Sequence, residues 1–325
     1  MAAMAADPAP SSSDTPTPVP FELCVYLAGH VPLDQYLDFL EAEAVGVTKS
    51  DRRRLSDDWR AADDRRRQLE QSERRLLEGE PLLADEEPLQ PLPDELAAMA
   101  PAVLEHPIFR RSFAAVPAPL AMVELDALVV YQRTINLEHV RKLRERLGPA
   151  PSARDVFHFC LPLDRPPSAP VRVRRLPKDE YMFTCDSTDL RFLEAVSLEP
   201  GQLREFDPLG PVAGVVGLVV GFGSNFLNVI SAEGRLVLNN GNHRAYALRE
   251  AGVTHAPCVV QEVSRREELK VVGGGRLRRD PDRYLSGPRP PMLRDFFDPA
   301  LARHVRLHKR TRHVRVKFTV EEESL

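Results

Sequence analysis

The stretch from Arg235 to Val263 constrains the fold more than any other part of the chain. Arg235 to Asn239 is rich in apolar and β-branched residues and predicts a strand. Gly241 then opens a helix for which Gly252 provides a C-cap. Ala256 to Val263 predicts a buried strand. This order of strand, turn, helix and strand indicates an α/β (α+β) fold.

Gly241 lies at the mouth of the predicted helix. A glycine there lets backbone N–H groups approach a ligand closely, and these groups and the helix dipole favour an anion. His243 and Arg244 follow in the first turn, where their side chains can close over a phosphate. Asn242 offers an amide that can orient a base, a water molecule or a backbone group. The same residues also fit an ordinary loop before a helix, so both interpretations are open.

An earlier segment has a similar order of elements. Met122 to Gln132 mixes apolar and β-branched residues and predicts a strand that ends in a turn. Asn136 is a good N-cap for a helix over residues 137–147, and Gly148 is its C-cap. Val156 to Leu163 predicts a second strand.

These segments together resemble the ParB/sulfiredoxin-like superfamily. Domains of that superfamily carry a Gly-x-His-Arg or Gly-Glu-Arg-Arg motif that opens a helix, and a Tyr-Gln-x-Arg turn before an earlier helix. The matching segments here are Asn240-Gly241-Asn242-His243-Arg244, Ala256 to Val260, and Tyr131-Gln132-Arg133 followed by Asn136 to Leu147. The resemblance covers residues 122–163 and 235–263, about 70 of the 325 residues.

The resemblance implies a small mixed sheet with helices and the handling of a nucleotide phosphate or DNA in a cleft between the two helices. Gly241, His243 and Arg244 would form one wall. The other wall would hold basic side chains at i, i+3 and i+7 on the first helix: His139, Lys142 and Arg146. A solvated basic face is the alternative interpretation of those three residues.

The sequence departs from the superfamily pattern at two positions. Sulfiredoxin-like members use a cysteine just before the His-Arg pair, where this chain has Asn242, so sulfinic-acid reductase chemistry is not supported. ParB-like members have an acid and an arginine in place of Asn242 and His243, which does not support their CTP switch. No helix-turn-helix pattern follows Val263.

The rest of the chain divides into segments of different composition. A helix is expected from about Leu33, and another over residues 48–79 whose thin apolar stripe indicates a solvated or partner-facing surface. Residues 264–291 are expected to be loop-like, and the last segment suggests an edge strand. The predicted segments are a disordered tail (1–20), a helical N-terminal region with a proline-rich linker (21–120), the α/β domain (121–263) with an insertion at about 164–234, and a basic C-terminal extension (264–325).

The apolar run from Leu209 to Phe222 is too short to span a bilayer and is expected to be buried core. Gly217, Gly221 and Gly223 only partly match a Gly-x-Gly-x-x-Gly pattern and are expected to allow close packing of the core instead. The N-terminus lacks the basic start and apolar centre of a secretory signal. The four cysteines form no Cys-x-x-Cys pair, and Cys160 and Cys258 are expected in the core. A cytoplasmic protein that does not enter a membrane is expected.

Charge is distributed unevenly within the net value of −4. Residues 1–120 hold 22 acids and 12 bases, whereas residues 264–317 hold 6 acids and 16 bases. The basic segment suits a phosphate-bearing partner, or pairs with the acidic segment of the same chain. The 38 arginines against 6 lysines are as consistent with codon usage as with phosphate binding.

Other candidate sites have weaker signals. Asp186, Asp189 and Glu194 could hold a metal beside a nucleotide, but are as consistent with exposed loop acids. His304 and His308 are four residues apart on a possible helix, with His313 nearby, and no acid beside them completes a metal site. Neither a Walker loop nor a Gly-x-Ser-x-Gly elbow occurs.

Three functional classes stay open at this point. The first is a binding module for a nucleotide or nucleic-acid phosphate. The second is a nucleotide-dependent phosphotransferase or nucleotide hydrolase, in which His243 is the candidate base and a nucleoside triphosphate with Mg²⁺ the cofactor. The third is a structural protein that binds a protein partner through helix 48–79.

Overall fold

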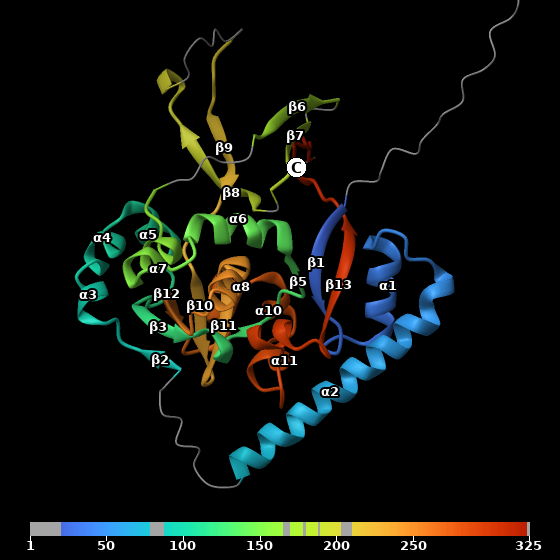
Figure 1. Cartoon of the computed structure of the whole chain (residues 1–325). Helices are drawn as coiled ribbons and strands as arrows, with labels where there is room; N and C mark the ends of the chain where they lie inside the picture. The colour runs from blue at the N-terminus through green and yellow to red at the C-terminus, as the bar shows by residue number, and fades with distance from the viewer. Residues whose placement is uncertain are drawn as a thin grey trace, which may run out of the picture.

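The computed structural model describes residues 21–78, 88–164, 170–177, 180–187, 189–202 and 210–323. The chain is mixed α/β, as predicted, and Figure 1 shows a body of sheet and helices from which two β structures project. The expected tail, residues 1–20, and most of the proline-rich linker lie outside the described residues.

The central sheet has six strands in the order β2-β3-β12-β10-β11-β4. β10 and β11 form a hairpin at Gly234, which has a φ of 73°. β10 runs parallel to β12 and β11 runs parallel to β4, while the remaining pairs are antiparallel. The strands are β2 (Leu89–Gln90), β3 (Leu120–Glu124), β4 (Val129–Val130), β10 (Asn228–Ala232), β11 (Arg235–Asn240) and β12 (His255–Glu262).

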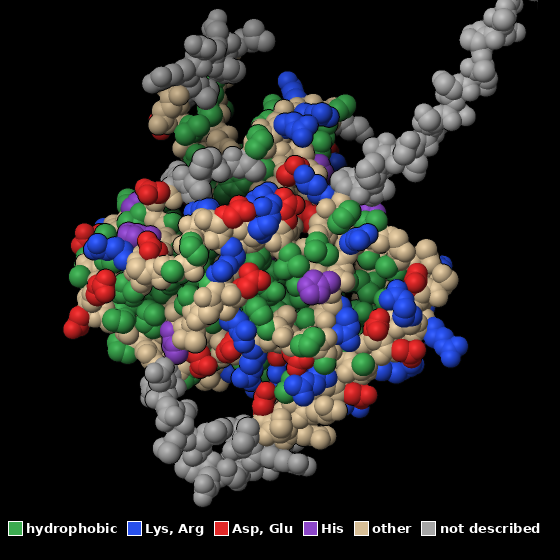
Figure 2. Space-filling model, viewed as in Figure 1, with side chains coloured by type: hydrophobic (Ala, Val, Ile, Leu, Met, Phe, Trp, Pro, Cys, Tyr) green, Lys and Arg blue, Asp and Glu red, His purple; other side chains and the backbone are tan. Residues whose placement is uncertain are grey.

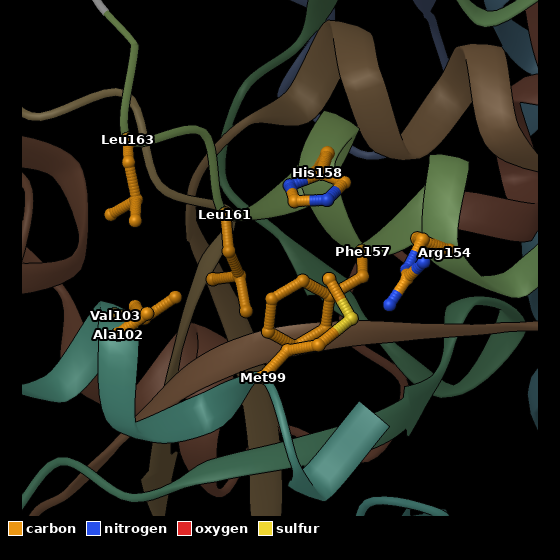
Figure 3. Close-up of a pocket in the computed structure, with 8 residues that line it drawn as sticks. All are labelled: Met99, Ala102, Val103, Arg154, Phe157, His158, Leu161 and Leu163. Carbon is orange, nitrogen blue, oxygen red and sulfur yellow. The ribbon is translucent and has the colours of Figure 1, made fainter. Parts of the chain in front are cut away.

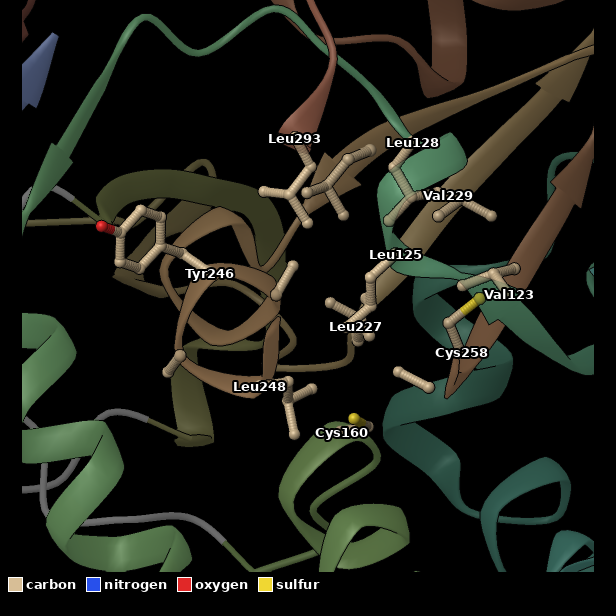
Figure 4. Close-up of a cluster of buried hydrophobic side chains, with 14 of the residues drawn as sticks. Val123, Leu125, Leu128, Cys160, Leu227, Val229, Tyr246, Leu248, Cys258 and Leu293 are labelled. Atoms are coloured by element: carbon tan, nitrogen blue, oxygen red, sulfur yellow. The ribbon is translucent and has the colours of Figure 1, made fainter. Parts of the chain in front are cut away.

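Two helices predicted from the sequence pack together beside this sheet: α6 (Leu137–Leu147) and α8 (Asn242–Glu250). The Asn136 side chain caps α6 by accepting the His139 backbone N–H at 3.0 Å, and Gly148 ends the helix with a φ of 81°. The buried face of α6 shares one hydrophobic cluster with α8 and the sheet. Figure 4 shows Cys160 and Cys258 within that cluster, so both cysteines are core residues as expected.

The strand predicted over Val156 to Leu163 is wrong, because residues Ala153–Cys160 form helix α7. Ser152 and Asp155 make a reciprocal capping box: the Ser152 hydroxyl accepts the Asp155 N–H at 3.2 Å, and Asp155 accepts the Ser152 N–H at 2.9 Å. The apolar run that suggested a strand is instead the inner face of a helix packed on β12.

Short helices before β3 cover one end of this core. Three short helices in this region begin at Asp94, Ala100 and Pro107. They are α3 (Asp94–Ala97), α4 (Ala100–Leu104) and α5 (Pro107–Ser112).

A second sheet joins both ends of the chain to the middle, in the order β13-β1-β5. β1 (Phe21–Leu27) pairs with β13 (Ala302–His308) and with β5 (Thr134–Asn136), both antiparallel. The N-terminal region therefore begins with a strand, which its composition did not reveal. The histidines expected on a helix, His304 and His308, lie on β13 instead.

Two predicted helices, α1 (Leu33–Glu43) and α2 (Arg52–Glu78), flank this second sheet (Figure 1). α2 follows a 3-10 helix, η1 (Lys49–Asp51). The stripe of α2 faces the protein itself, since Leu55 and Ala62 are buried and the Trp59 indole donates to the Val31 carbonyl at 2.8 Å.

Ion pairs in this region form both within the basic segment and between it and the acidic segment. Arg289 donates to Asp295 at 2.6 and 2.7 Å, and His30 lies 2.8 Å from the same buried carboxylate. Burial alone would raise the pKa of Asp295, but the Arg289 and His30 hydrogen bonds outweigh it and hold the pKa well below its usual value. Glu73 on α2 also contacts Arg289 and Arg294. Part of the basic excess is therefore neutralised within the chain.

The region expected to be loop-like contains short helices, because its apolar residues pack against β10 and β11. Leu269, Leu277 and Tyr284 are buried with Ile230 and Val237. The elements are η4 (Arg266–Glu268), α9 (Leu269–Val272), α10 (Gly275–Arg279), α11 (Pro281–Leu285) and η5 (Leu293–Phe297).

The two projecting structures come mainly from the predicted insertion. One is a three-stranded antiparallel sheet of β6 (Arg172–Leu176), β7 (Glu180–Cys185) and β14 (Arg312–Lys317). The other is a two-stranded ribbon of β8 (Leu190–Leu198) and β9 (Val215–Phe222), with a 3-10 turn, η3 (Pro200–Gln202), after β8.

The apolar run that contains β9 is not buried core, which corrects the expectation for Leu209 to Phe222. Val216 is 66% exposed and Val219 is 40% exposed. A ribbon of two strands lies only one layer deep, so these side chains face outward. Gly217, Gly221 and Gly223 meet side chains of the facing strand β8 instead of a packed interior.

Candidate functional site

Gly241 forms the turn between β11 and α8. Its φ of 94° is in the left-handed region that favours glycine. A Cβ at this position would lie 2.6 Å from Leu227 Cδ1 and 3.1 Å from Arg244 Nη2. Among the described residues, no side chain caps the N-terminus of α8, so its first amide groups are available to an acceptor from outside the helix.

Arg244 points into the protein and does not lie over the helix end as the sequence suggested. It is 5% exposed. Its Nη1 donates to the carbonyl oxygens of Phe159 at 3.3 Å, Cys160 at 3.0 Å and Asn225 at 2.5 Å. Burial lowers the pKa of Arg244 to about 10, so the guanidinium is still charged at neutral pH. The side chain therefore joins the end of α7 to the loop before β10.

Two buried polar atoms near Gly241 have no partner among the described residues. One is Nη2 of Arg244, a donor, and the other is Oδ1 of Asn242, which is 7% exposed. Unpaired buried polar atoms are rare and costly, and they often mark the place of a water or an ion. Both belong to the first turn of α8, behind its uncapped end.

His243 connects α8 to α6. Its Nε2 accepts the Asn136 backbone N–H at 3.0 Å, which places the proton of the neutral ring on Nδ1. The His243 ring meets the His139 ring edge to face, with centroids 5.0 Å apart. Burial, and then the neighbouring His139, lower the pKa of His243 to about 3. His243 is therefore neutral at physiological pH.

The contact between His243 and Asn136 brings two helix N-termini together, because Asn136 is the N-cap of α6 and His243 lies in the first turn of α8. Each helix has the positive end of its dipole at this junction. The pKa of His139 is also lowered, by burial first and then by the charges of Lys142, Arg244 and Arg146. Burial is the larger cause of this shift, but the positive charges that contribute to it also favour a bound anion.

Of the three basic residues that were predicted to line the site from α6, only one contacts His243. His139, Lys142 and Arg146 are exposed, opposite the buried residues of the helix. His139 reaches His243, whereas Lys142 pairs with Glu138 on its own helix at 2.9 Å. We call the region formed by Gly241–Arg244, Asn136 and His139 the helix junction.

The sequence did not reveal the contacts of Arg191, which lies on β8, or of Tyr131. The Arg191 guanidinium occupies the space where a Cβ of Gly223 would lie, and it pairs with Asp189. The Tyr131 hydroxyl donates to the backbone carbonyl of Asn239 at 2.8 Å. The Tyr-Gln-x-Arg turn was noted in the sequence, but its contact with β11 spans 108 residues and leaves no local signal.

The predicted acidic cluster is not assembled in the structure. Asp186 pairs with Lys309, Asp189 with Arg191 and Glu194 with Arg111. The described residues contain no group of three or more histidine, cysteine or acidic side chains that could hold a metal ion. His313 lies on β14, where its Nδ1 is 3.0 Å from the Thr184 hydroxyl oxygen.

A separate pocket of about 320 Å³ lies between α4 and α7. Its walls are largely apolar, with Met99, Val103, Phe157 and Leu161 among them. Figure 3 shows Arg154 and His158 as its nitrogen-bearing side chains, both from α7. None of the predicted site residues lines it.

Comparisons with protein-family models, curated proteins and solved structures find no match to this chain. No helix in the described ranges is both long and apolar enough to cross a bilayer.

Proposed function

We propose that the helix junction binds a phosphate group of a nucleotide or nucleic acid. The observation that carries the proposal is the meeting of two helix N-termini, one of them uncapped, in front of a buried guanidinium with an unpaired Nη2. Backbone N–H groups at helix N-termini are common phosphate ligands. The ParB/sulfiredoxin-like resemblance supports the same placement, because its phosphate motif falls on Gly241 to Arg244.

Each residue has a distinct role in this proposal. The amides of Asn242 and His243 donate to the phosphate, and the Nδ1–H of His243 faces the same ligand. Arg244 contributes positive charge from behind the turn, and His139 and Arg146 contribute from α6. Local positive charge and aligned donors together select a dianion over a neutral ligand.

Binding is favoured over catalysis by the state of His243. A general base must be free to accept a proton, but its Nε2 already accepts the Asn136 N–H and its pKa is about 3. A purely partner-binding role has less support, because the apolar residues Leu55 and Ala62 of α2 are buried within this chain.

The test uses residues whose replacement leaves the fold intact. Arg244 does not qualify, because its guanidinium holds three backbone carbonyls. His139 and Arg146 are exposed, so the double variant His139→Gln/Arg146→Gln changes the site alone. Arg141→Gln is the matched control, because Arg141 is exposed on α6 and pairs with Glu145 at 2.7 Å.

Calorimetric titration with inorganic phosphate, ADP, ATP and CTP, each with and without Mg²⁺, measures the affinity. We expect one of the nucleotides to bind the wild type, and the double variant to bind it roughly tenfold more weakly, equivalent to about 1.4 kcal/mol. Arg141→Gln should bind as the wild type does. No binding by the wild type at millimolar concentration, or equal binding by the double variant, would overturn the proposal.

A further inference from the structure

The projecting sheet of β6, β7 and β14 has two chemically different faces. Residues paired across antiparallel strands lie on the same face, and neighbours along a strand alternate between faces. Arg172 pairs with Thr184, which pairs with His313; Arg174 pairs with Met182, which pairs with Arg315. One face therefore carries five basic side chains from two strands: Arg172, Arg174, His313, Arg315 and Lys317. We call it the basic face.

Few acids neutralise the basic face. Glu180 is the carboxylate on it, and it lies 3.8 Å from Arg315 and 3.9 Å from Lys317. Arg172 and Arg174 are exposed and form no ion pair with any described residue. Among the described residues of this face, four permanent cations thus stand against one carboxylate. Figure 2 shows Lys and Arg side chains gathered over this lobe.

Arginines elsewhere on the surface are paired differently. On α2, Arg54, Arg60 and Arg67 each contact an aspartate three or four residues away, at 2.7–3.2 Å. That helix is a self-neutralised surface. On the basic face, Arg315 and Lys317 share one carboxylate at longer distances, and Arg172 and Arg174 have no such partner among the described residues. This distinguishes the face from an ordinary solvated charged surface.

The shape of the basic face determines the kind of anion that it fits. Alternate residues of a strand are about 6.8 Å apart, so the cations form a flat, regularly spaced array instead of converging on one point. Such an array matches a polymer with repeated charges better than a single phosphate. Figure 1 shows the sheet on the same side of the body as α6, so an extended ligand can run along that side.

We propose that the basic face binds the sugar-phosphate backbone of a nucleic acid. This site is distinct from the helix junction, and it does not depend on nucleotide binding there. Binding by phosphate contacts is independent of base sequence and weakens steeply with salt.

The test compares the wild type with the full-length variant Arg172→Gln/Arg174→Gln/Arg315→Gln/Lys317→Gln. The control variant Arg53→Gln/Arg54→Gln/Arg60→Gln/Arg67→Gln removes the same net charge from α2. Fluorescence anisotropy at 50 to 200 mM salt measures binding of a labelled 30-nucleotide DNA strand, the same strand of RNA, and the corresponding DNA duplex. Vesicles of phosphatidylserine and phosphatidylcholine serve as a competing polyanionic surface.

If each cation contacts one phosphate, the four contribute about 2.8 to the salt slope for a single strand and about 3.6 for a duplex. When salt rises fourfold, the affinity of the wild type should then fall more than the affinity of the variant of the basic face. The difference should be about 50-fold for a single strand and about 150-fold for a duplex. The α2 control should keep the wild-type slope. Preference among the three nucleic acids identifies the natural form.

An unchanged salt slope in the variant of the basic face would overturn this inference, as would an equal loss in the α2 control. Binding to vesicles but not to nucleic acid would overturn it as well. Nucleotide titration of the same variant separates the two proposals: unchanged nucleotide affinity with lost strand binding supports both sites. Failure of nucleotide binding in the wild type, with the salt slope intact, would reject the helix junction alone.

Discussion

Replacement of Arg244 should destabilise the protein even when no ligand is present. Arg244→Met keeps a long, unbranched side chain but removes every donor. Three carbonyl oxygens then lose the Nη1 hydrogen bond, those of Phe159, Cys160 and Asn225. A residue that served only to grip a ligand would leave the stability of the free protein unchanged.

The size of the effect follows from the partners that remain. The Cys160 carbonyl keeps the Leu227 N–H at 2.7 Å. Of the other two oxygens, that of Phe159 belongs to a buried residue, whereas Asn225 is exposed and water can replace the lost donor there. A buried acceptor that loses its partner costs about 1–3 kcal/mol. Removal of a desolvated charge offsets part of that cost. We therefore expect a loss of about 2 kcal/mol, which lowers the Tm by roughly 3 °C in a chain of this size.

Urea denaturation followed by circular dichroism measures the change, with thermal unfolding as a second assay. Arg146→Met is the matched control, because Arg146 is exposed, and it should change stability by less than about 0.5 kcal/mol. Arg244→Lys should recover only part of the lost stability, because one ammonium group reaches fewer carbonyls than the guanidinium does. Equal midpoints for Arg244→Met and the wild type would refute the structural role assigned to this guanidinium.

Two further predictions concern the same turn. In urea denaturation, Gly241→Ala should lower the free energy of unfolding by about 1–3 kcal/mol more than Gly252→Ala does. Both glycines have positive φ, but only a Cβ at Gly241 would meet an atom of a neighbour, at 2.6 Å. Equal losses of stability in the two variants would contradict this close approach. Acidification from pH 7.5 to 5 should reduce the free energy of unfolding by up to about 2 kcal/mol through His243. The pKa of His243 is about 3 in the folded protein and lies below the usual 6.5. Within this pH range, only the unfolded chain therefore takes up the proton. His243→Gln should make that pH profile shallower, and His30 and His139, whose pKa values are also lowered, account for part of the slope that remains. An identical profile in the variant would show that His243 does not contribute to it.

Local signals in the sequence predicted those elements whose limits are set by neighbouring residues. Asn136 and Gly148 fix the two ends of α6, and Gly241 and Gly252 fix those of α8. The Ser152–Asp155 capping box was an equally local signal for α7. It was outweighed by an apolar run that fits a strand and a buried helix alike.

Long-range contacts account for the parts that the sequence did not predict. The carbonyl partners of Arg244 lie up to 85 residues away, so a motif that resembles a phosphate grip did not reveal a buried cross-link. β1 depends on partners in β5 and β13. β9 is exposed because no other element of the described chain packs over it. The composition of a strand does not show whether another layer of structure will cover it.

The central claim is that an anion binds at the N-terminus of α8, and its most direct measurement is an NMR titration of the ¹⁵N-labelled full chain with the nucleotide selected by calorimetry. The account predicts that the backbone amide signals of Asn242 and His243 shift the most, together with the His139 ring signals. Saturation of the protein with those signals unmoved, or with the largest shifts at the α4–α7 pocket, would contradict it.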